Sequence, residues 1–84
     1  MVDQSKEPVG IEHVPGRCGG RAVIIGHRLT VWLFEAMRRR GITMKEVLEM
    51  YDHITAEQVQ AAWDYADTHQ EEIQRDIDDQ FRDD

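Results

Sequence analysis

Two helix starts of the same kind constrain the fold more than any other feature of this 84-residue sequence. Thr43 lies three residues before Glu46, and Thr55 lies three residues before Gln58. This is capping-box spacing, in which the threonine hydroxyl accepts from the third helical amide while the longer side chain bonds back to the cap amide. An apolar residue before each cap faces another four residues after it, as in a hydrophobic staple. The sequence therefore predicts two helices that each begin directly after a threonine.

A third helix is predicted ahead of these two. Thr30 can cap a helix over about Val31 to Arg40, although no acid follows at the third position. Its last turn is basic and Gly41 follows, which suits a left-handed C-terminal cap. Two helices joined by a short glycine-containing turn and followed by another helix are typical of a helix-turn-helix protein.

The segment before the helices is predicted to form a β-hairpin. Ala22–Ile25 is apolar and mostly β-branched, Ile11–Val14 alternates apolar and polar residues, and the turn formers of 15–20 connect them. We expect a mainly α fold with a three-helix helix-turn-helix core, this hairpin, and an acidic C-terminal helical extension. The expected parts are a flexible arm over 1–10, the hairpin and helix-turn-helix domain over 11–69, and an acidic amphipathic helix or tail over 70–84. That last part is either a continuation of the third helix or a separate fourth helix.

The distribution of charge is more informative than the net charge of −7. Between Arg17 and Lys45 there are seven basic residues and one acid, whereas twelve acids and two basic residues follow from Glu49 onward. Such asymmetry predicts two different contact surfaces. No apolar run is long enough to span a membrane, and a single cysteine allows no internal disulfide, so we expect a cytoplasmic protein.

The basic half is a candidate phosphate-binding surface, because Lys and Arg neutralise phosphates and release counterions. The alternative is structural, since cations near a helix C-terminus complement its dipole. The third helix is a poor recognition helix, because only Gln58 and Gln60 could contact base edges. If DNA is bound, we expect the hairpin and the first two helices to contact it. The candidate DNA-binding residues are Arg17, Arg21, Arg28, Arg38, Arg39, Arg40 and Lys45.

An apolar line runs through the acidic C-terminal segment. It can continue the domain core, or it can bind in the groove of a partner through anchors at i, i+4 and i+8. We favour the partner, because nine acids between Asp64 and Asp84 would repel one another in isolation and would be attracted to a basic surface. The candidate partner-binding residues are Ile73, Arg75, Ile77, Phe81 and Arg82.

The sequence contains no pattern typical of an enzyme or a metal site. Cys18 and the four histidines lack Cys-x-x-Cys and His-x-x-x-His spacing, so we expect no metal. No nucleophile–base pair, carboxylate dyad or P-loop is visible, so we expect neither catalysis nor a cofactor. Trp32 and Trp63 are interpreted as core anchors rather than as a ligand cage.

The turn, the strand after it and the first helix start resemble a known family. Pro15–Ile24 and Gly26–Val31 are similar to the Cys-Gly-Gly-Lys/Arg-Pro-Val-Ile and Gly-Thr-Arg-Ile-Thr/Pro-Val patterns of domain-of-unknown-function family 433. Ala22 replaces the usual proline and His27 the usual threonine. The resemblance covers about Ile11 to His69.

The resemblance implies a function that the residues alone do not. Members of family 433 are similar to helix-turn-helix proteins and are described as VapB-like antitoxins that accompany a PIN-like ribonuclease toxin. The chain would then silence such a toxin through its C-terminal segment, where Arg75 or Arg82 could pair with metal-binding carboxylates. It would also bind operator DNA as a homodimer. The alternative is a protein-interaction module or small transcription regulator without a toxin partner.

Overall fold

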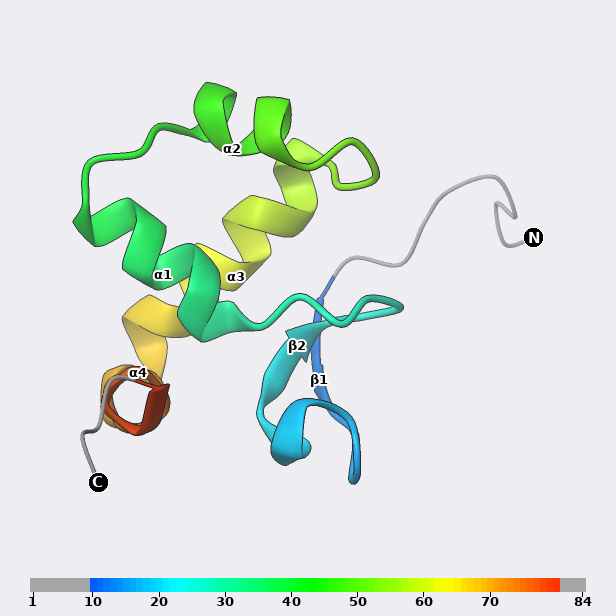
Figure 1. The fold of residues 1–84 in the computed structure, drawn as a ribbon, viewed down its shortest axis with the longest axis vertical. Helices are drawn as coiled ribbons and strands as arrows, with labels where there is room; N and C mark the ends of the chain where they lie inside the picture. The colour runs from blue at the N-terminus through cyan, green and yellow to red at the C-terminus, as the bar shows by residue number, and fades with distance from the viewer. Residues whose placement is uncertain (1–9, 81–84) are drawn as a thin grey trace.

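The computed structural model describes residues 10–80 of the chain. It is mainly helical, with four helices and a two-stranded antiparallel sheet on their N-terminal side (Figure 1). The predicted flexible arm lies, apart from Gly10, outside the described residues. The elements are β1 (Ile11–His13), a 3₁₀ turn η1 (Cys18–Gly20), β2 (Ala22–Ile24), α1 (Val31–Arg39), α2 (Met44–Met50), α3 (Ala56–Thr68) and α4 (Gln70–Gln80).

The predicted hairpin is present, with Glu12 of β1 opposite Val23 of β2. Every residue of β2 is buried, and this strand contacts α1 and α3, so the sheet packs on the helices as expected. The thiol of Cys18 donates to the backbone carbonyl of Arg28 at 3.3 Å, which ties the hairpin turn to the loop before α1.

Both predicted capping boxes are formed. Thr43 accepts from the Glu46 amide at 3.2 Å and donates its own amide to that carboxylate at 3.0 Å. The amide of Gln58 donates to Thr55 at 3.2 Å, and the Thr55 amide donates back to the Gln58 side chain at 2.9 Å. Thr30 precedes α1 as predicted but makes no side-chain capping bond.

The core lies between α1, α3 and β2. Phe34 of α1 and Val59 of α3 have no exposed surface. Trp63 is buried beside them and donates its indole N–H to the carbonyl of Phe34 at 2.9 Å, which joins α3 to α1. This confirms Trp63 as a core anchor, and Trp32 packs, partly buried, against the same core.

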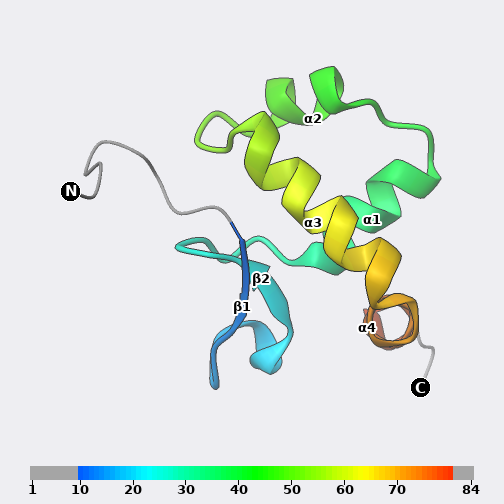
Figure 2. The same ribbon diagram turned by 180° about the vertical axis from the view of Figure 1, so that it is seen from behind.

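The C-terminal segment is a separate fourth helix. The backbone leaves helical geometry at His69 (φ −133°, ψ 48°), and α4 starts in a new direction (Figure 2). The Thr68 hydroxyl donates to the carbonyls of Asp64 and Tyr65 at the end of α3. The bend turns Ile73 into the core, where it is 1% exposed, and burial of such a side chain stabilises a fold by about 1.5–3 kcal/mol.

The hairpin and α4 occupy one end of the molecule, and α2 lies at the other (Figure 1). Among residues 10–80, no helix combines the length and the apolar character that crossing a membrane requires.

Candidate functional site at the interface of helix α4

The acidic helix α4 lies against basic side chains of the hairpin and of α1. Arg21, directly before β2, extends to α4, where its Nη2 is 3.3 Å from Asp79 and its Nε is 3.6 Å from Asp76. The Nε atom is buried and has no hydrogen-bond partner, because Asp76 is too distant for one. Burial raises the pKa of Asp76 above its ordinary value, although the Arg21 charge opposes that rise. Arg21 therefore forms ion pairs with α4, but its Nε–H donor has no hydrogen-bond acceptor among residues 10–80.

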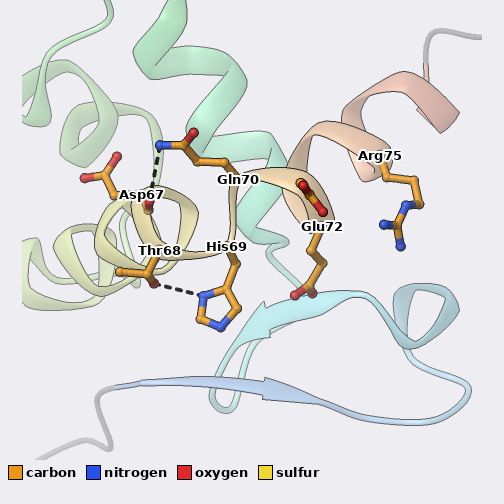
Figure 3. A pocket seen from close by; sticks show the side chains of 7 residues that line it. Asp67, Thr68, His69, Gln70, Glu72 and Arg75 are labelled. Carbon is orange, nitrogen blue, oxygen red and sulfur yellow. Dashed lines mark hydrogen bonds between the residues drawn. The ribbon is translucent and has the colours of Figure 1, made fainter.

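Glu72 connects α4 to β1 and α3. One carboxylate oxygen lies 2.7 Å from Nε2 of His13, and the other accepts from the Tyr65 hydroxyl at 2.7 Å. Figure 3 shows the Glu72 side chain directed from α4 toward the hairpin. The Tyr65 ring also stacks on His69, with centroids 3.8 Å apart and planes 4° apart. Residues that are far apart in sequence thus come together at the bend before α4.

The same network changes the ionisation of its members. Burial alone would raise the pKa of Glu72, but hydrogen bonds from His13 and Tyr65 outweigh it and lower that pKa. Burial, followed by the neighbouring Glu72 carboxylate, raises the pKa of Tyr65 well above its ordinary value. At neutral pH the pair is therefore a carboxylate that accepts from a neutral phenol.

Glu35 is a buried carboxylate that joins the basic end of α1 to the rest of the molecule. It is 8% exposed and pairs with Arg38 at 2.6 Å and with Arg39 at 2.9 Å. Arg38 also pairs with Asp67 of α3 at 2.6 Å, and Arg39 donates to Gln74 of α4 at 2.7 Å. The lone acid of the basic half is therefore the point where two arginines are anchored.

The structure divides the predicted DNA-binding residues into two groups. Arg17, Arg21, Arg38 and Arg39 all pair with acids of the same chain, Arg17 through Glu12 at 3.3 Å. The other group is exposed and makes no side-chain ion pair or hydrogen bond within residues 10–80. It consists of Arg28, Arg40 and Lys45.

The predicted partner-binding line points inward where the structure describes it. Ile73 is a core residue and Ile77 is partly buried against the core, so these two side chains follow the alternative in which α4 continues the core. The favoured partner interpretation did not anticipate the bend at His69, which turns this face of α4 back onto α1. Arg75 is exposed, whereas Phe81 and Arg82 lie outside the described residues.

Two surface depressions accompany these contacts. One, of about 560 Å³, is open, lies at the bend and is lined by the polar and charged residues Asp67–Glu72 and Arg75 (Figure 3). The other, of about 390 Å³, is more apolar, lies between α1 and α2, and includes Trp32 and Met50. Met50 is 56% exposed. Within residues 10–80 no three His, Cys, Asp or Glu side chains are grouped so that they could hold a metal ion.

Sequence reasoning missed the polar network. Glu35 with Arg38 and Arg39 has i, i+3 and i, i+4 spacing, and this signal could have identified the pairs inside α1. No comparable signal marks His13 and Glu72, which are 59 residues apart in sequence.

The fold and this interface define a small, mainly α-helical domain in which the acidic helix α4 packs beside the N-terminal hairpin and pairs with its side chains. The family model described as "Protein of unknown function (DUF433)" matches residues 11–66, and the chain belongs to that family. A similar solved structure is the crystal structure of a DUF433 member protein from Anabaena variabilis. It is 43% identical with a TM-score of 0.75, and the match covers 80% of this chain and 66% of that one. This chain thus spans just under two thirds of that protein. None of the curated proteins matches it.

The family match confirms the resemblance to family 433. Neither the family description nor the description of the solved structure mentions an antitoxin, a helix-turn-helix or DNA.

Proposed function

We propose that this protein is the antitoxin of a type II toxin–antitoxin pair and neutralises a PIN-like ribonuclease by direct contact. The resemblance to family 433 suggests the class of partner, and the surface charge supports the mode of binding. A ribonuclease must attract RNA phosphates, so its substrate-binding surface is basic. An antitoxin that covers such a surface needs exposed negative charge.

The observation that supports this proposal most strongly is the sorting of charges. Most of the acids of α3 and α4 are exposed, while Arg21, Arg38 and Arg39 are paired with carboxylates of the same chain. Most of the nearby arginines are thus neutralised within the chain, whereas α3 and α4 keep exposed carboxylates. The exposed acids are Glu57, Asp64, Asp67, Glu71, Asp78 and Asp79, of which Asp67 and Asp79 pair with Arg38 and Arg21.

Charge reversal on this surface tests the proposal. Truncation before α4 is unsuitable because it would remove Ile73 from the core. We expect Asp64→Lys with Glu71→Lys to abolish co-purification with the product of the neighbouring open reading frame. The matched control, Glu49→Lys with Asp52→Lys, makes the same change in net charge near α2 and should retain the partner. No nuclease bound to the unaltered chain, or equal losses in both variants, would overturn the proposal.

Operator binding is a second candidate, favoured by the exposed, unpaired state of Arg28, Arg40 and Lys45 within residues 10–80. In this proposal α2, the turn 51–55 and α3 form the helix-turn-helix of a homodimer. The exposed residues of α3 include Glu57, Asp64 and no Lys or Arg, so the proposed contacts are to phosphates rather than to base edges.

The operator proposal predicts salt-dependent binding to the DNA upstream of the gene. Arg28→Gln and Lys45→Gln should each weaken binding similarly for all sequences and reduce the salt slope by about one. A chain that binds no DNA even at low salt would instead be a protein-interaction module.

A further inference from the structure

We propose that α4 is an autoinhibitory strap whose carboxylates occupy basic groups that nucleic acid would otherwise use. The inference rests on the operator-binding part of the proposed function and adds its regulation. It concerns Arg21 of the hairpin, which pairs with Asp76 and Asp79 of α4, whereas Arg39 of α1 reaches α4 only through the neutral side chain of Gln74.

The α4 carboxylates take the positions that phosphate oxygens would take. Asp76 and Asp79 approach the Arg21 guanidinium from one side, and its Nη1 approaches the Cys18 carbonyl at 3.5 Å. A guanidinium binds carboxylates and phosphates through the same N–H donors, so one ligand excludes the other. Nucleic acid can therefore contact Arg21 fully only when these two carboxylates move away.

The contact between Arg21 and the α4 carboxylates can be replaced by a contact with phosphate. Arg21 keeps a buried Nε that no hydrogen bond satisfies, and the Asp76 oxygen is 3.6 Å away. A phosphate oxygen at hydrogen-bond distance would satisfy that donor better. The side chains of Arg21 and Asp79 are also 28% and 32% exposed, so solvent and salt reach the pair.

The attachment of α4 to the core depends mainly on one buried side chain, with Ile77 partly buried beside it. Within α4, Ile73 is the buried residue, whereas α1 and α3 each bury several. The break at His69 separates α4 from α3, so α4 can open without unwinding α3. Segments with few buried apolar contacts open at lower free energy than the rest of a domain.

Removal of the two carboxylates in the full-length chain tests the strap. Asp76→Asn with Asp79→Asn keeps Ile73 and should strengthen binding to the upstream DNA. Because Arg21 gains a phosphate contact, the slope of log K against log salt should steepen by about one. Arg21→Gln added to this double variant should remove the gain.

A matched control separates release of Arg21 from a change in net charge. Glu57→Gln with Glu71→Gln removes the same amount of negative charge at exposed positions of α3 and α4, and the salt slope should not change. Circular dichroism checks that all variants remain folded.

The outcomes distinguish the strap from the function on which it rests. If the unaltered chain binds DNA and the Asp76, Asp79 double variant binds with the same salt slope, the strap is wrong while operator binding stands. The same conclusion follows if the control variant steepens the salt slope as much as the Asp76, Asp79 double variant does. If neither the unaltered chain nor any variant binds DNA, operator binding fails and the strap fails with it.

Discussion

Helices α3 and α4 are adjacent in sequence, but local interactions specify the start of α3, whereas long-range interactions position α4. The start of α3 is specified by neighbours in sequence, because Thr55 and Gln58 exchange hydrogen bonds across three residues. The position of α4 depends on distant partners, since Glu72 contacts His13 and Asp79 contacts Arg21. A locally capped helix should therefore respond to changes in its own cap, and α4 to changes elsewhere in the molecule.

The largest expected change in the free energy of unfolding comes from truncating the buried side chain that holds α4 against the core. Ile73→Ala should lower the free energy of unfolding by about 2–5 kcal/mol, because it leaves a cavity in a closed core. Urea denaturation measures this change. Ile77→Ala is the matched control and should have a smaller effect, since Ile77 is only partly buried. If the two variants lost equal stability, the view that Ile73 anchors α4 would be wrong.

A smaller effect is expected at the local cap. Thr55→Ala should lower the free energy of unfolding by about 1 kcal/mol, within a range of roughly 0.5–2, because the Gln58 amide loses its acceptor. Thermal or urea denaturation provides the measurement. Thr55→Ser retains the hydroxyl and should stay close to the unaltered protein. A serine variant as unstable as the alanine variant would mean that the capping bond contributes nothing.

The hydrogen bonds and burial around Tyr65 should affect its titration and the stability of the fold at alkaline pH. Burial and the Glu72 carboxylate raise the pKa of Tyr65, so the folded chain keeps this proton longer than the unfolded chain. The stability from this difference is fully present below the unfolded pKa of about 10 and is lost as pH rises through the folded pKa. Tyrosinate absorbance should show a late-titrating group that Tyr65→Phe removes. Glu72→Gln should move it toward the ordinary value, and an unchanged titration would contradict the assigned cause.

The smallest expected effect concerns the ion pairs that join α4 to the hairpin. Arg21→Gln should change the free energy of unfolding by about 1 kcal/mol or less, because partly exposed pairs contribute little net stability. Arg28→Gln, at an exposed arginine, should change it even less. A loss as large as that of Ile73→Ala would show that ion pairing, rather than burial, holds α4 in place.

Much of the fold could be predicted because its signals are local. The capping boxes at Thr43 and Thr55 and the β-branched strand at Ala22–Ile24 all act over a few residues. The end of α1 was predicted less accurately, since this helix stops at Arg39 rather than at Arg40. The candidate site was only partly predicted: the basic residues were identified, but not the acids that occupy several of them. Arg21 illustrates the reason, because its Asp79 partner is 58 residues away.

Four features could be read from the amino-acid sequence alone: the mainly helical class, the hairpin, the two capped helix starts and membership of family 433. Each follows from short-range hydrogen bonding, apolar periodicity or a contiguous motif. The bend at His69 and the inward packing of α4 through Ile73 are visible only in the folded molecule. No glycine or proline marks this bend. It is stabilised by burial and by charge pairs between distant segments, and those energies exist only once the chain has folded.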